Sequence, residues 1–215
     1  MPLIAPSLLA ADFLHLQDAC TMLNTSEADW YHLDVMDGRF VPNISYGPMV
    51  VKQLRPATKK IFDVHLMIEE PEKYFEDFKN AGADHIHIHW EACPHLHRQL
   101  QQIKAMGMKA GIAINPHTPI HFLEDVLQEA DMLCLMSVNP GFGGQKFIAN
   151  TLIKIREAKK MIADKKLNLL IEVDGGVTEQ NAAEIVAAGA DVLVAGSSVF
   201  QAADPIAAIK NLKNC

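Results

Sequence analysis

The sequence predicts an α/β fold of the (β/α)8 TIM-barrel type, formed by one domain that spans residues 1–215. Short β-rich runs alternate with amphipathic helical patterns along the whole chain, which is typical of a parallel sheet built from βα units. Eight β-rich runs in 215 residues give about 27 residues per unit, the size of a βα repeat. The tetrapeptide AGAD also occurs twice, each time where a glycine ends a helical pattern and a strand begins.

The predicted strands are short and mostly apolar. In chain order they are 3–7 (LIAPS), 30–36 (WYHLDVM), 60–67 (KIFDVHLM), 84–90 (DHIHIHW), 108–114 (MKAGIAI), 132–138 (MLCLMSV), 168–174 (NLLIEVD) and 192–196 (VLVAG). Helical patterns between them include EKYFEDFKNAG, HLHRQLQQIKAMG, FIANTLIKIREAKKMI and TEQNAAEIVAAG. In an open, doubly wound sheet the first strand would normally lead into a glycine-rich loop, whereas here it leads into PSLLAADF. Eight units therefore favour a closed barrel, with its active end at the carboxyl ends of the strands.

Composition limits the classes of partner. The chain is 49% apolar and 21% charged, which suits one well-formed core. The net charge is −7 and no basic block occurs, so we expect no nucleic-acid partner. No apolar run approaches the roughly 20 residues of a membrane span. The cysteines lack CxxC spacing and no signal peptide is recognisable, so we expect reduced thiols in a cytoplasmic protein; they are Cys20, Cys93, Cys134 and Cys215.

Polar and sulfur-bearing residues gather at one end of the predicted strands. In the second strand His32, Asp34 and Met36 alternate with apolar residues and therefore share one face. The residues of this kind, strand by strand, are Ser7; His32, Asp34 and Met36; His65 and Met67; His89 and Glu91; Asn115; Met136 and Asn139; Asp174; and Gly196, Ser197 and Ser198. Because the carboxyl ends of barrel strands surround one mouth, these residues predict a single pocket.

Two histidines and two aspartates within this set predict a divalent metal site. His32, Asp34, His65 and Asp174 offer imidazole and carboxylate ligands, which suit one Zn, Fe, Mn or Co ion. Two buried carboxylates without a cation would be costly. The alternative is a layer of hydrogen-bonded polar groups in the barrel core.

The run HIHIH at 85–89 contains three histidines but is poorly suited to bind one metal ion. His85, His87 and His89 share one face but lie along a single strand, about 6–7 Å apart, so they point side by side. We expect His87 to pack inside the barrel and His89 to contact a ligand residue or the substrate. The remaining histidines of loops and helices, which we expect to be solvated, include His95, His97, His117 and His121.

Glycine-rich turns after the last three strands predict a phosphate site. They are NPGFGGQ at 139–145, DGG at 174–176 and GSS at 196–198. Glycines let backbone N–H groups approach an oxyanion, and barrels often bind phosphate on these loops. Lys146 is the only lysine nearby, so amides would hold the phosphate. Met36, Met67 and Met136 have the inward parity of their strands and fit either core packing or an apolar pocket lining.

Six motifs, in order along essentially the whole chain, resemble the ribulose-phosphate 3-epimerase family. They are APSLLAADF (5–13), HLDVMDGRFVPN (32–43), DVHLMIEEP (63–71), SVNPGFGGQKF (137–147), EVDGG (172–176) and AGSSVF (195–200). The resemblance implies a barrel of the ribulose-phosphate-binding type that interconverts D-ribulose 5-phosphate and D-xylulose 5-phosphate in the pentose phosphate pathway. It implies a divalent metal bound by His32, Asp34, His65 and Asp174, with Asp34 and Asp174 as the catalytic acid–base pair. The substrate contacts that it implies are Ser7, His65, Gly141, Phe142, Gly143, Gly144, Gly175, Gly176, Gly196 and Ser197.

The reaction itself can be reasoned from chemistry. Inverting a carbinol carbon beside a ketone requires one carboxylate to remove its proton and another to return a proton to the opposite face. A metal bound to the ketone and hydroxyl oxygens would stabilise the enediolate. Asp34 and Asp174 lie on different arcs of the predicted barrel, which makes this 1,1-proton transfer possible.

Other functions fit less well. A barrel decarboxylase or aldolase would need a lysine at a strand end, and none is present there. A non-catalytic phosphate-binding barrel would not need two acids facing one carbon. A closely similar 3-epimerase for a six-carbon ketose phosphate, such as D-allulose 6-phosphate, is the alternative that the sequence separates least. We expect a phosphosugar substrate and a homo-oligomer.

Overall fold

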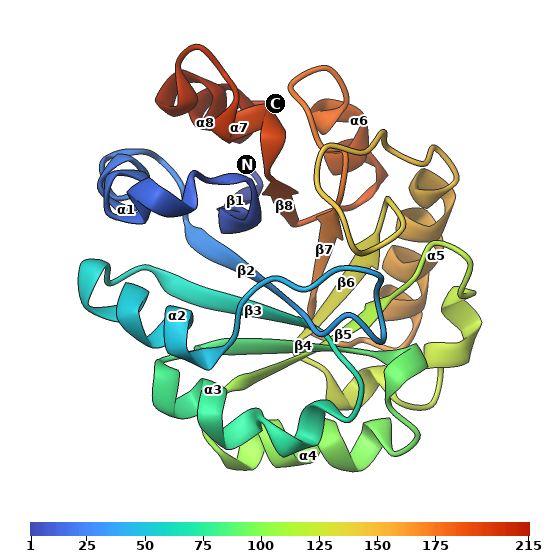
Figure 1. The fold of residues 1–215 in the computed structure, drawn as a ribbon. Coiled ribbons are helices and arrows are strands. Elements are labelled where there is room, and N and C mark those ends of the chain that lie inside the picture. The colour runs from blue at the N-terminus through green and yellow to red at the C-terminus, as the bar shows by residue number, and fades with distance from the viewer.

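Eight parallel strands form one sheet in the computed structural model, which describes all 215 residues (Figure 1). The neighbour order is β1-β8-β7-β6-β5-β4-β3-β2, and a bridge between Ser7 and His32 connects β1 to β2. The strands are β1 (Leu3–Pro6), β2 (Trp30–Met36), β3 (Ile61–Met67), β4 (His85–His89), β5 (Lys109–Ile114), β6 (Met132–Met136), β7 (Leu170–Asp174) and β8 (Val192–Ala195). All eight predicted strands are present, so the barrel prediction is confirmed.

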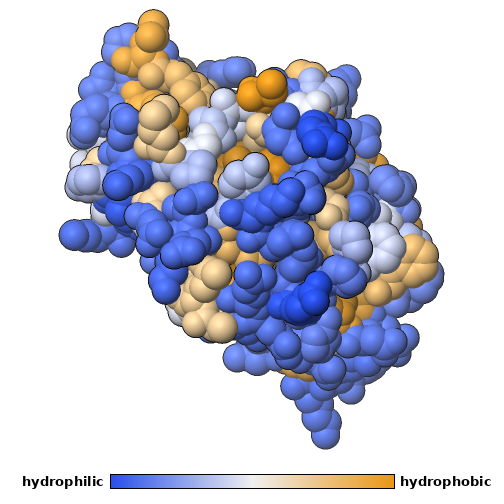
Figure 2. Space-filling model, turned by 60° about the horizontal axis from the view of Figure 1, so that its bottom comes forward, coloured by the Kyte–Doolittle hydropathy of each residue, from blue (hydrophilic) through white to orange (hydrophobic).

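Eight α-helices cover the outside of the barrel (Figure 1). They are α1 (Leu16–Thr25), α2 (Pro48–Leu54), α3 (Phe75–Ala81), α4 (Leu96–Ala105), α5 (Thr151–Asp164), α6 (Ala182–Ala188), α7 (Ser197–Phe200) and α8 (Pro205–Lys213). The face shown in Figure 2 is largely hydrophilic, with separate smaller apolar areas. None of the helices combines the length and the apolar character that crossing a membrane requires.

The prediction that strands and helices alternate strictly is wrong for the fifth βα unit. Between β5 and β6 the chain forms only the short 3-10 turns Ile120–Leu123 and Leu127–Glu129. Pro116 and Pro119 lie in this connection. Proline lacks the N–H donor and disfavours a helical conformation in the residue before it, which opposes an α-helix early in this segment.

Four aspartates join neighbouring strands at the amino-terminal end of the barrel. Each directly precedes an even-numbered strand, and its carboxylate accepts the N–H near the start of the preceding odd-numbered strand. The bonds run from Ile4 to Asp29 (2.7 Å), Phe62 to Asp84 (2.8 Å), Ala110 to Asp131 (3.0 Å) and Ile171 to Asp191 (2.9 Å). The two AGAD segments are thus part of a fourfold structural repeat.

Apolar residues form one large cluster and three smaller ones. The outward side chains Tyr31, Leu33 and Val35 of β2 pack in the large core between sheet and helices. A smaller apolar cluster has the buried members Ala5, Trp30, Met132, Val192 and Val194, of which Val194 also lines the pocket. The pocket opens at the carboxyl ends of the strands, where Asp34 and Asp174 contribute polar side chains to its lining.

Candidate metal centre and pocket

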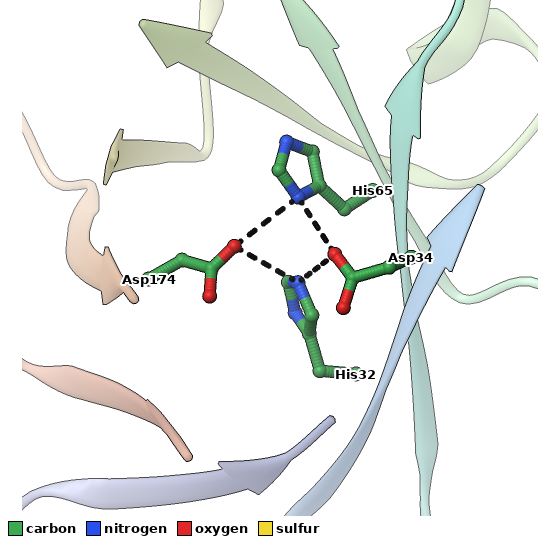
Figure 3. Close-up of side chains that lie close together, drawn as sticks. All are labelled: His32, Asp34, His65 and Asp174. Carbon is green, nitrogen blue, oxygen red and sulfur yellow. Dashed lines mark hydrogen bonds and ion pairs between the residues drawn. The ribbon is translucent and has the colours of Figure 1, made fainter. Parts of the chain in front are cut away.

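Four side chains from β2, β3 and β7 meet at the pocket floor (Figure 3). Their ligand atoms all lie within 4.8 Å of one another, and the residues are His32, Asp34, His65 and Asp174. Asp34 Oδ1 lies 3.3 Å from His32 Nε2 and 3.2 Å from His65 Nδ1. Asp174 Oδ2 lies 3.7 Å and 3.4 Å from the same two nitrogens. The two carboxylates therefore face each other across the pair of histidines.

The donor atoms fit a divalent cation. His32 Nε2 is buried and makes no hydrogen bond, so its lone pair has no partner within the protein. Metal–ligand bonds of about 2.0–2.1 Å in a tetrahedral site separate adjacent ligands by roughly 3.3 Å. The separations of 3.2–3.7 Å between histidine nitrogens and aspartate oxygens match this spacing.

Electrostatics at the centre favour positive charge. Burial opposes ionisation of Asp34, but the neighbouring His32 and His65 outweigh it and hold the pKa of Asp34 below its usual range. Burial likewise opposes protonation of the histidines, yet the surrounding carboxylates raise the pKa of both His32 and His65. Protons and a metal ion would compete for the same nitrogens.

Strand register holds His32 in place through an aspartate that the sequence analysis did not identify. In the β2–β3 pair the Cα of Asp63 lies opposite that of His32, and Asp63 Oδ2 is 2.7 Å from His32 Nδ1. The other oxygen, Oδ1, is 2.8 Å from His87 Nε2. His87 is thus an interior residue, as expected. Asp63 precedes His65 by two residues, so inward parity was the signal that could have found it.

His89 contacts His65 of the four-residue centre rather than the pocket. Its Nε2 lies 2.9 Å from His65 Nε2, and its Nδ1 lies 3.2 Å from Glu91 Oε2. Burial lowers the pKa of His89 to about 4. For Glu91, burial is outweighed by hydrogen bonds from His89, Thr118 and Asn115, which lower its pKa to about 2. A neutral histidine thus lies between the Glu91 carboxylate and His65.

Glu172 is a second inward residue that the sequence analysis did not identify. It is fully buried, and neither carboxyl oxygen has a hydrogen-bond partner. Burial and the nearby Asp63 raise the pKa of Glu172 well above its usual range, which favours the neutral form of the carboxyl group. Ligand atoms of Glu172, His87 and Cys134 also lie within 4.8 Å of one another, but none of these three residues lines the pocket.

The pocket above the four-residue centre has a volume of about 370 Å³. Of the predicted substrate contacts, His65 alone is absent from its lining, because this side chain lies fully buried in the floor. The predicted residues in the lining are Ser7, Asp34, Met36, Met67, Met136, Gly141, Phe142, Gly143, Gly144, Asp174, Gly175, Gly176, Gly196 and Ser197. Lining residues that the sequence analysis did not assign to the pocket include Leu9, Phe147, Thr178 and Asn181.

Ser7 contacts the centre as well as the pocket. Its hydroxyl donates to Asp34 Oδ2 at 2.5 Å, which leaves Oδ1 of that carboxylate directed at the histidines. The contact arises at the point where the barrel closes, since Ser7 is bridged to His32. Closure of the barrel thus orients one of the two acids.

The glycine turns bring backbone close to the pocket. Gly176 has φ +64°, and a Cβ there would lie 2.4 Å from the backbone nitrogen of Phe147. Only glycine allows the turn after β7 to approach the loop after β6 this closely. Ser197 lines the pocket, whereas the Ser198 hydroxyl donates to the Val177 carbonyl at 2.7 Å. The two serines therefore have different roles.

The histidines outside the barrel interior are solvent-exposed, as predicted. His95, His97, His117 and His121 all lie on the surface. Lys146 lines the pocket, but it belongs to the loop after β6 and not to a strand end. A barrel decarboxylase or aldolase would need a lysine at a strand end, and the pocket lining contains none there.

Comparison with known proteins gives consistent matches over nearly the full length. The model of the ribulose-phosphate 3 epimerase family matches residues 3–200. A ribulose-phosphate 3-epimerase from Synechocystis sp. is 54% identical over 215 residues, covering 98% of this chain and 94% of the relative. The protein of the same name from Bacillus subtilis is 52% identical, covering 98% and 97%. That from Escherichia coli K12 is 48% identical, covering 94% and 90%.

Solved structures support the fold independently. The chain superposes on KGPDC from Streptococcus mutans with a TM-score of 0.75 at 14% identity, covering 100% of this chain and 96% of the other. For a 3-hexulose-6-phosphate synthase the TM-score is 0.70 at 20% identity, with 100% and 99% covered. At such low identity these similarities concern the barrel architecture alone.

Proposed function

Because the chain belongs to the ribulose-phosphate 3-epimerase family, we propose that it interconverts D-ribulose 5-phosphate and D-xylulose 5-phosphate with one divalent cation. The observation that carries the proposal is the convergence of two carboxylates on a histidine pair at the pocket floor. His32, Asp34, His65 and Asp174 would hold the cation. Zinc, iron, manganese and cobalt all accept this set of ligands.

Asp34 and Asp174 would transfer the protons. In one direction Asp34 removes the proton from the carbinol carbon beside the ketone, and Asp174 delivers a proton to the opposite face. In the other direction the roles exchange. The lowered pKa of Asp34 supports its starting as the ionised base. The facing arrangement of the two carboxylates supports their acting on opposite sides of one carbon.

Charge that develops on the substrate oxygens also needs stabilisation. A bound divalent cation would supply it as a Lewis acid. Met36, Met67 and Met136 line the same pocket and would exclude water from the reacting carbon.

The glycine turns would hold the substrate's phosphate. Gly141–Gly144, Gly175, Gly176, Gly196 and Ser197 line the pocket from the loops after β6, β7 and β8. Binding the phosphate there fixes the distance from the anchored end to the reacting carbon. The pentose phosphate is favoured over a six-carbon ketose phosphate because the similar curated proteins carry the ribulose-phosphate name.

The decisive experiment is proton exchange at the reacting carbon. Enzyme incubated with D-ribulose 5-phosphate in D2O should form D-xylulose 5-phosphate that carries deuterium at that carbon. Asp34→Asn and Asp174→Asn variants should form product at least about 100-fold more slowly. Product formation without deuterium at the inverted carbon would exclude the two-acid mechanism, and faster turnover of D-allulose 6-phosphate would exclude the proposed substrate.

We also expect a role in the pentose phosphate pathway, a cytoplasmic location and a homo-oligomeric state. Unpaired thiols support the location, since all four cysteines are free and Cys20, Cys93 and Cys134 are buried. Sedimentation equilibrium of the purified protein would measure the oligomeric state.

A further inference from the structure

A hydrogen-bonded chain leads away from the metal centre and has no part in the proposed proton transfers. His65 Nε2 contacts His89 Nε2 at 2.9 Å, and His89 Nδ1 contacts Glu91 Oε2 at 3.2 Å. The other carboxylate oxygen, Oε1, accepts the backbone N–H of Asn115 at 2.8 Å and the hydroxyl of Thr118. Both histidines are fully buried. The chain thus connects a metal-ligand residue to the backbone after β5.

The far end of this hydrogen-bonded chain is anchored by a buried lysine. Lys154 of α5 donates to the backbone carbonyls of Asn115 (2.8 Å) and Pro116 (3.2 Å). This lysine is buried, with 5% of its surface exposed. The segment that carries the Asn115 N–H is therefore tied to a helix of the outer layer.

The direction of each hydrogen bond follows from its donor. The Asn115 N–H can only donate, and the Glu91 carboxylate can only accept. His89 must therefore carry its proton on Nδ1, which leaves an acceptor lone pair on Nε2. His65 must then donate from its own Nε2. Its Nδ1, which lies 3.2 Å from Asp34 and 3.4 Å from Asp174, is left to bind a cation.

We propose that Glu91 and His89 are positioning residues that set the tautomer of His65 and present its Nδ1 lone pair to the cation. This inference rests on the metal site proposed above. It assigns a function to the Glu91 carboxylate, although that group does not line the pocket.

A Glu91→Gln variant tests this hydrogen-bonded chain. Glutamine has the shape of glutamate but reverses the direction of the hydrogen bond to His89. The Asn115 N–H requires the glutamine carbonyl oxygen, so the glutamine NH2 group must face His89 Nδ1. His89 then accepts at Nδ1 and carries its proton on Nε2. His65 Nε2 must accept the hydrogen bond from the His89 Nε2–H, so His65 carries its own proton on Nδ1, where the cation would bind.

The experiment combines histidine 15N NMR with cation titration. In metal-free wild-type protein at neutral pH we expect the His89 proton on Nδ1, and in Glu91→Gln on Nε2. The dissociation constant for Zn²⁺ should rise about 10–100-fold in the variant. Glu129→Gln is the matched control. Glu129 pairs with the exposed His97 at 3.6 Å, and its replacement by glutamine removes one negative charge, as Glu91→Gln does. The control should change neither measurement.

Two outcomes would overturn the inference. One is a Glu91→Gln variant with the wild-type His89 tautomer and Zn²⁺ affinity. The other is wild-type protein whose His89 proton is on Nε2, a result that needs no folded variant. The proposed reaction is tested separately by wild-type turnover of D-ribulose 5-phosphate. An inactive wild-type protein that still shows the tautomer and affinity changes would refute the reaction and retain the positioning chain.

Discussion

Single residues decide how the side chains of the four-residue centre are oriented. Gly111 on β5 shows how strict this can be, since a Cβ there would lie 2.3 Å from His87 Nδ1. The missing side chain makes room for the His87 ring, which contacts Asp63, and Asp63 in turn contacts His32. A glycine on β5 thereby supports the orientation of His32, a proposed metal ligand.

At this scale, Asp34→Asn should lower kcat by at least about 100-fold, because the amide can neither remove a proton nor supply an anionic ligand. The fold should persist, since the side chain keeps its shape. Steady-state turnover and circular dichroism measure the two effects. Asp18→Asn on exposed α1 is the control and should behave as wild type. Wild-type turnover by Asp34→Asn would remove this residue from the mechanism.

Elements divide the barrel into a stabilising end and a reactive end. The four aspartates that precede β2, β4, β6 and β8 all bind strand N–H groups at the amino-terminal end. The glycine turns and the four-residue centre lie at the carboxyl-terminal end. Substitutions at the two ends should therefore have separable effects on stability and catalysis.

Asp131→Ala should lower the free energy of unfolding by about 1–3 kcal/mol, because it removes a charged hydrogen bond to the Ala110 N–H. It also removes ion pairs with Lys109 and Lys104 at 3.1 and 3.9 Å. Turnover should be unchanged. Urea unfolding measures the loss, with the exposed Asp125→Ala as control. Unaltered stability would show that this carboxylate does not hold the strands together.

Ser197→Asp tests the reactive end. A carboxylate in the proposed phosphate site should repel the substrate's phosphate and raise KM about 10-fold or more. Ser197→Ala, which adds no charge, should raise KM much less. Initial rates over a range of D-ribulose 5-phosphate concentrations measure both. An unchanged KM for Ser197→Asp would place the phosphate elsewhere.

The whole molecule creates the centre by closing the barrel. The four proposed ligand residues come from positions 32 to 174 of the chain, and curvature of the sheet brings β2, β3 and β7 around one axis. Carboxylates gathered in this way repel one another unless a cation lies between them. Cation binding should therefore contribute to both activity and stability.

Removal of the metal should abolish turnover and lower the melting temperature, because a ligand that binds only the folded state stabilises it. Zinc, iron, manganese or cobalt added back should restore both. Coupled assays and calorimetry on chelated and reconstituted protein measure the effects. Full activity in a rigorously metal-free sample would defeat the metal assignment.

Alkaline pH should destabilise the fold through its buried thiols. Burial raises the pKa of Cys93 to about 12, and it also raises the pKa of Cys20 and Cys134. Above about pH 9 the unfolded thiol releases its proton while the folded thiol keeps it. The stabilising contribution of these thiols is thus complete below that pH and decreases as pH rises. For Cys93 the free energy of unfolding falls by about 1.4 kcal/mol per pH unit between about pH 9 and its folded pKa.

Urea unfolding in the presence of a reductant, repeated across this pH range, measures the slope. Cys93→Ala should have a shallower slope than wild type, whatever its stability at neutral pH. Equal slopes would mean that the Cys93 thiol does not contribute to the alkaline loss.

The sequence by itself determined the eight strands, their inward faces, the four proposed ligand residues and the glycine turns. These features depend on local rules: side chains alternate along a strand, and the carboxyl ends of parallel strands converge. His32, Asp34 and Met36 could be placed on one face from their spacing alone.

Only the tertiary structure decided which polar groups pair. Register places Asp63 opposite His32 and His65 opposite Asp34, and strand register between distant segments is not encoded in either segment alone. The same is true of the chain from His65 through His89 to Glu91. Contacts of this kind depend on the register of neighbouring strands in the closed sheet. The folded barrel therefore decides which nitrogen each histidine directs toward the four-residue centre.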